Sequence, residues 1–130
     1  MSAYEINGGD TLIAGMVAPI ITASVIVKSG PTVHLSRGTV LGVVEKVTTG
    51  QFAGTYIVAP VDSTKTDGSQ TPFGILADEE VDATTADQRA TAYVSGEFNR
   101  DALKFGGTDT IAKHEVALRN IGIITKRVVK

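Results

Sequence analysis

The 130-residue sequence contains no cysteine and no tryptophan, and aromatic residues make up only 5% of it. Without cysteine, the chain has no disulfide framework, no thiolate metal site and no cysteine nucleophile. With so few aromatic rings, the core has to be light and built mainly from Ala, Val, Ile and Thr, a composition that favours strands. Because a small chain with a light core buries little apolar surface, self-association would add burial that the single chain lacks.

The composition is that of a folded domain without a general attraction to nucleic acid. Hydrophobic residues make up 42% and charged residues 20% of the sequence, as in a globular chain, and the length fits one domain. The net charge is −2, and Phe105 is the only aromatic residue in the basic segment 100–130. A nucleic-acid platform needs rings beside its cations, so we expect no nucleic-acid partner.

Charges of opposite sign gather in different parts of the chain. Residues 62–87 hold seven acidic residues against one lysine, and residues 100–130 hold seven basic residues against three acidic ones. Charge runs usually face water, which gives two solvated surfaces. The alternative is head-to-tail electrostatic attraction between neighbouring copies in an assembly. The sequence leaves both interpretations open.

Residues 12–27, LIAGMVAPIITASVIV, form an uncharged stretch. Its 16 residues fall short of the roughly 20 needed to span a bilayer. The flanking Glu5 and Asp10 are acidic, so the basic region of a signal peptide is missing. Gly15 and Pro19 interrupt the stretch and many of its residues are β-branched, which predicts an extended strand rather than a helix. We expect a soluble protein with no targeting segment and no membrane partner.

An apolar extended segment of this kind has to be covered, because unpaired strand edges recruit partners. Three coverings are open: the chain's own domain, another subunit, or a target to which the segment adds a strand.

The rest of the chain reads as mostly β. Strands are expected at residues 37–47, 55–61, 73–77, 89–98 and 122–129, from apolar runs and period-two alternation between turn signals. One helix is expected after an N-cap at Asp109 or Thr110, with Ile111, Leu118 and Ile121 on one face and Gly122 as its stop. A shorter helical turn is expected at residues 99–103.

The burst of carboxylates after the strand at residues 73–77 is the strongest candidate for chemistry. Its members are Asp78, Glu79, Glu80, Asp82 and Asp87. Neighbours in an extended segment point in different directions, and a calcium loop would need a Gly turn and a distal Glu. We therefore expect a solvated corner between two strands, with no catalytic pair and no metal site.

The remaining polar residues form no reaction centre either. His34 has no partner nearby in sequence, and His114 falls on the apolar face of the expected helix, where a packed imidazole is the better interpretation. The serines lie in no nucleophile-elbow pattern, and the paired glycines lack the lysine of a phosphate loop. We expect no enzyme, no cofactor and no small-molecule substrate.

One long segment carries a family resemblance. Residues 67–103, DGSQTPFGILADEEVDATTADQRATAYVSGEFNRDAL, together with SRGTVLG at 36–42 and ALRNIGI at 117–123, resemble the lambda-type head decoration proteins of tailed bacteriophages. These motifs cover about residues 36–130, and the first 35 residues are not matched closely.

The resemblance implies a mainly β (α+β) fold: a small compact β-barrel or sandwich-like body of the β-tulip type, with one or two short helices and an extended N-terminal arm. It implies two parts, an arm at residues 1–35 and a decoration-protein β domain at 36–130. It further implies a virion protein, made in the host cytoplasm, that binds the outer surface of the expanded capsid as a homotrimer. There, at three-fold and quasi-three-fold positions, it would bind the major capsid protein and stabilise the head against DNA pressure.

The arm is the expected contact region, because the resemblance and the uncharged stretch at residues 12–27 agree on a segment that needs a partner. The residues expected to contact the capsid or a neighbouring subunit are Leu12, Ile13, Val17, Ile20, Ile21 and Val25. The alternative function is a trimeric adhesion module displayed on the virion, whose expected signature is a cluster of exposed aromatic residues for sugar stacking.

Overall fold

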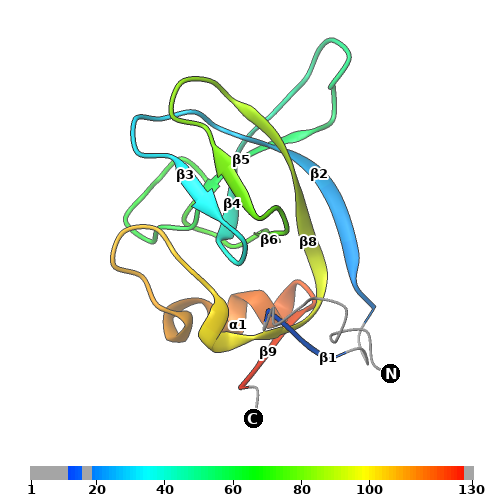
Figure 1. Ribbon diagram of the computed structural model, residues 1–130, viewed down its shortest axis with the longest axis vertical. Coiled ribbons are helices and arrows are strands. Elements are labelled where there is room, and N and C mark those ends of the chain that lie inside the picture. Colours follow the sequence, from blue (N-terminus) through cyan, green and yellow to red (C-terminus); the bar gives the residue numbers. More distant parts are fainter. Residues whose placement is uncertain (1–11, 16–18, 128–130) are drawn as a thin grey trace.

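The computed structural model describes residues 12–15 and 19–127, and these form a mainly β body with one α-helix (Figure 1). The strands are β1 (Ile13–Gly15), β2 (Ile21–Val27), β3 (His34–Ser36), β4 (Val40–Lys46), β5 (Tyr56–Pro60), β6 (Gly74–Leu76), β7 (Glu80–Asp82), β8 (Gln88–Asn99) and β9 (Ile123–Lys126). The helices are the 3-10 helix η2 (Arg100–Ala102) and α1 (Ile111–Asn120).

Strands β8, β2, β5, β4 and β6 close into a barrel. Each pairs with the next, and β6 pairs back onto β8, with Ile75 opposite Tyr93 and Leu76 opposite Ala92. Most pairings are antiparallel, but β2 and β5 run parallel. The closed ring removes free edges along most of these strands. The expected compact β-barrel body is therefore confirmed.

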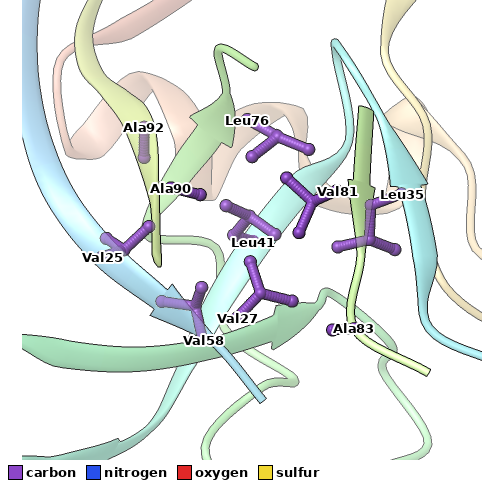
Figure 2. Packing of buried hydrophobic residues seen from close by; sticks show 10 residues of the cluster. All are labelled: Val25, Val27, Leu35, Leu41, Val58, Leu76, Val81, Ala83, Ala90 and Ala92. Atoms are coloured by element: carbon purple, nitrogen blue, oxygen red, sulfur yellow. The ribbon is translucent and has the colours of Figure 1, made fainter. Parts of the chain in front are cut away.

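The barrel is filled by small aliphatic side chains (Figure 2). Strands β3 and β7 form a separate two-stranded sheet and add their inward side chains to the same cluster. Together they give a light core of Val, Leu and Ala, as the low aromatic content predicted. The members are Val25, Val27, Leu35, Leu41, Val58, Leu76, Val81, Ala83, Ala90 and Ala92.

A second cluster lies at the end of the barrel that carries β1, β9 and α1, low in Figure 1. Neighbouring residues of one strand belong to different clusters, because successive side chains point to opposite faces of the strand. In β4, Val40 packs in the second cluster and Leu41 in the first. The second cluster consists of Leu12, Val40, Val61, Ile75, Phe98, Leu118 and Ile123. It joins both terminal strands and the helix to the barrel.

The local predictions agree with the structure apart from one side chain and one pair of strands. Helix α1 follows Thr110 and is followed by Gly122, which has a φ of +91°. Ile121 was expected on the buried face, but it is 42% exposed, because the helix ends one residue earlier. The short sheet of β3 and β7 was not expected, since β7 lies within the acidic stretch that was interpreted as a corner.

More of the N-terminal segment belongs to the body than the sequence suggested. Strand β2 was placed in an arm at residues 1–35, but it pairs with β8 over its whole length and with β5 at Val25, Ile26 and Val27. Alternate residues Val25 and Val27 face the barrel interior, which explains the β-branched composition of this stretch. Of the three possible coverings, the chain's own domain covers β1 and β2.

Candidate functional site

Two of the expected contact residues belong to the protein's own core. Leu12 is 2% exposed and packs in the second cluster, and Val25 is 1% exposed and packs inside the barrel. The Asn99 N–H donates a hydrogen bond to the Leu12 carbonyl at 2.6 Å. Both side chains therefore hold the N-terminal segment on the body rather than presenting it to a partner.

The other described contact candidates lie nearer the surface. Ile13 and Ile20 are half-buried, and Ile21 is 53% exposed. The Ser95 hydroxyl donates to the Pro19 carbonyl at 2.9 Å, which fixes the chain just before β2. Val17 lies outside the described residues. Ile21 is thus the described candidate with the largest apolar surface exposed.

A buried carboxylate lies where three strands meet. Glu97 of β8 is in register with Gly15 of β1 on one side and with Ile124 of β9 on the other. Its side chain is only 4% exposed and forms an ion pair with Lys126, whose side chain is 47% exposed. Glu97 was not among the residues expected to have a special role, although a lone carboxylate beside Phe98 in an apolar strand indicates a buried charge that needs a partner. The pair links the two terminal strands through β8.

Three basic residues of the segment 100–127 form ion pairs within the chain: Arg100, Lys126 and Arg127. Arg100 donates to both carboxylate oxygens of Glu115, each at 3.2 Å, and Arg127 lies 3.3 Å from Asp101. The Thr125 hydroxyl donates to Glu115, and this hydrogen bond, with Arg100, holds the pKa of Glu115 below its usual value. This internal pairing favours solvated surfaces over head-to-tail attraction between copies.

Several aspartates act as turn residues. In each case one carboxylate oxygen accepts hydrogen bonds from the backbone N–H and the hydroxyl two positions later, at 2.6 to 3.1 Å. Such local bonds fix a turn, and they hold the pKa of each carboxyl below its usual value. The pairs are Asp62–Thr64, Asp67–Ser69 and Asp82–Thr84. These carboxylates are structural.

The acidic corner also uses its carboxylates to hold neighbouring strands. Asp78 accepts from the Thr91 N–H at 2.8 Å, and Asp87 accepts from the Ser29 N–H at 2.7 Å. Within the ranges described, no group of three or more His, Asp or Glu side chains converges as a metal site. The carboxylates of Asp78, Asp82 and Asp87 thus bond to different neighbours.

The arrangement most like a catalytic centre joins Ser63, Asp109 and His114. The Ser63 hydroxyl donates to one oxygen of Asp109 at 2.7 Å, and His114 Nε2 lies 2.7 Å from the other. Phe105 stacks on the imidazole with ring centroids 5.3 Å apart. A nucleophilic serine needs the imidazole next to its hydroxyl, and here the carboxylate stands between them. The network instead attaches the start of α1 to the loop after β5.

Large aliphatic side chains are exposed on and near α1. Val116 is 73% and Ile121 42% exposed. The helix itself is ten residues long, and no helix in the described part of the chain combines the length and apolar character needed to cross a membrane.

Comparison with known proteins gives one family. The family model described as "Bacteriophage lambda head decoration protein D" matches residues 4–124. The match begins well before the motifs quoted from the sequence and includes β1 and β2. No curated protein matches the chain significantly.

Proposed function

Because the chain belongs to the bacteriophage lambda head decoration protein family and is thus a structural protein of the phage head, we propose that it binds the outside of the expanded capsid as a homotrimer. The trimers would occupy three-fold and quasi-three-fold positions, bind the major capsid protein there, and stabilise the head against the pressure of the packaged DNA. The family match over residues 4–124 carries this proposal.

The attachment is proposed to use the N-terminal arm. Leu12 is buried in the body, so the residues before it are the part of the arm that can reach the shell without unfolding β1. Eleven residues in extended conformation span up to about 36 Å, which is sufficient to add a strand to a neighbouring sheet. Ile13, Ile20 and Ile21 are proposed to contact the capsid or a neighbouring subunit beside the arm, and so is Val17.

Self-association is supported by the light core and by the exposed aliphatic side chains. Both clusters consist largely of Val, Ala, Leu and Ile, and Val116 and Ile21 expose more than half of their surface. Trimer formation would remove such surface from water, at a gain of about 25 cal/mol per Å².

Cosedimentation with empty capsids tests the proposal. The full chain is expected to pellet with expanded capsids of its phage and to stay in the supernatant with unexpanded ones. A variant lacking residues 1–11 should lose capsid binding and keep its oligomeric mass and β-type circular dichroism. The deletion has to stop before Leu12, because Leu12 and β1 are part of the second cluster. Binding of the full chain to neither capsid form would refute the proposal.

The adhesion module is not favoured. Among the described residues, Phe52 and Tyr56 are the aromatic side chains with a third or more of their surface exposed. Each has a cation over its ring, Arg89 over Phe52 and Lys46 over Tyr56. Rings covered in this way do not form an open platform for stacking sugars.

A further inference from the structure

The two terminal strands meet on the last residues of β8. Strand β1 pairs antiparallel with β8 at Glu97 and Phe98, and β9 pairs parallel with it from Gly96 to Asn99. In Figure 1 these strands lie together at the lower end of the molecule, next to α1. The segment that leads to residues 1–11 is therefore attached to the same four residues as the C-terminal strand.

The pairing of β1 alone is weak. The strand has three residues, and its register shifts between Ile13 and Gly15. Strands this short with an irregular register specify their position poorly. Leu12 adds an apolar anchor just before β1, but a side chain that packs at one point does not fix the direction in which the segment runs.

The Glu97–Lys126 pair supplies a second fixed point. A Cβ atom on Gly15 would lie 2.7 Å from Glu97 Oε1 and 3.5 Å from Lys126 Nζ, so the backbone of β1 runs directly against this ion pair. Only a glycine at position 15 leaves room for the carboxylate in its present place. Strands β1, β8 and β9 therefore meet at one carboxylate that is almost completely shielded from water.

We propose that Glu97 and Lys126 are positioning residues for the N-terminal arm: their ion pair fixes the backbone of β1 at Gly15 and so sets where the arm leaves the body toward the capsid. The inference rests on the proposed function for its capsid-binding consequence, but not for the anchoring itself. The carboxylate of Glu97 is shielded from water, whereas Lys126 is half exposed. Loss of Lys126 removes the cation that this buried charge faces, and the local structure has to relieve the cost. The relief is expected at β1, the shortest of the three strands that meet there.

The test compares Lys126→Met with the wild type and with Lys65→Met, which changes an exposed lysine in the loop after β5. Hydrogen exchange followed by mass spectrometry is measured on free protein. In Lys126→Met, peptides that contain residues 12–15 are expected to exchange about tenfold faster or more, whereas peptides from β4 and β5 keep their rates. Lys126→Arg, which keeps the charge, should restore slow exchange. Unchanged exchange at residues 12–15 in Lys126→Met would overturn the proposal.

A second variant keeps the charges and moves the carboxylate. Gly15→Ala places a methyl group against Glu97, and it is expected to raise exchange at residues 12–15 in the same way. If it leaves exchange there unchanged, the contact at Gly15 does not fix β1 and the proposal fails.

Measurements of capsid binding then test the positioning role of the ion pair separately from the proposed function. With wild-type protein that pellets with expanded capsids, Lys126→Met is expected to bind about tenfold more weakly, and Lys65→Met and Lys126→Arg to bind as the wild type does. Faster exchange with unaltered capsid affinity would overturn the positioning role. Wild-type protein that binds no capsid would refute the proposed function, and the exchange result would still decide whether the pair anchors β1.

Discussion

The carboxylate of Asp109 lies 2.7 Å from Nε2 of His114, and the two side chains are only 2% and 6% exposed. His114 is the main cause of a pKa of about 2 for Asp109, and the Ser63 hydroxyl and N–H add to it. The pair connects Asp109, two positions before α1, with the buried face of the helix. Protonation of Asp109 in acid would therefore weaken the attachment of α1.

The free energy of unfolding should fall steeply in acid. Because the folded-state pKa of Asp109 lies below its ordinary value of 3.8, its contribution is fully present above about pH 4 and is lost as the pH falls toward 2. Urea denaturation between pH 2 and 5 should show this loss, and Asp109→Asn should show a flatter profile from a lower starting value. Glu45→Gln, at an exposed carboxylate of β4, is the matched control. A profile for Asp109→Asn as steep as that of the wild type would contradict the assignment.

Phe98 should be the most costly aromatic residue to truncate. It is completely buried in the second cluster and packs against Tyr93 with centroids 5.4 Å apart. Phe98→Ala is expected to reduce the free energy of unfolding by about 3–5 kcal/mol, measured by urea denaturation. Phe52→Ala, at a ring that is 36% exposed, should cost about 1 kcal/mol or less. Equal losses at both sites would contradict this account of the core.

Gly68 and Gly50 both have positive φ angles, +109° and +84°, but only Gly68 lies against backbone. A Cβ atom there would collide with the Val43 carbonyl oxygen, whereas Gly50 has open space around it. Gly50→Ala should therefore cost about 1–2 kcal/mol from the backbone alone, and Gly68→Ala about 1–3 kcal/mol more from the collision. Thermal denaturation of the two variants measures the difference, and a Gly50→Ala variant as unstable as Gly68→Ala would contradict it.

The proposed trimer should persist in high salt. Arg100 and Arg127 already pair with carboxylates of their own chain, so attraction between copies through the basic third is not expected to hold the trimer together. Light scattering should give three times the mass of the chain, both at low salt and at about 1 M salt, where the screening length is about 3 Å. Dissociation at high salt would support the head-to-tail electrostatic interpretation instead.

Local features of this fold were readable from sequence, but its long-range pairings were not. Helix α1 followed from the spacing of Ile111 and Leu118 and from Gly122, because helical periodicity is a local property. The sequence also predicted that residues 12–27 are extended. It could not show that β2 inserts between β5 and β8, because an apolar β-branched strand looks the same whether its partner is its own barrel or another chain.

The polar contacts show the same division. The Asp82–Thr84 turn is local, and a carboxylate followed by a hydroxyl two positions later is a visible pattern. Ser63 and Asp109 are 46 positions apart, and Glu97 and Lys126 meet only because β9 runs parallel to β8. Such contacts depend on the completed topology, which no spacing in the sequence reveals.

Strand β8 also has a mechanical consequence. Its twelve residues pair in turn with β2, β6, β1 and β9. One continuous backbone therefore runs from the far end of the barrel to the point where the two terminal strands β1 and β9 are attached. A pull on β1 along its axis loads its bonds to β8 in shear, and β8 spreads that load over β2 and β6. Tension applied to β1 is therefore transmitted to the entire barrel, and β1 does not detach from β8 by itself.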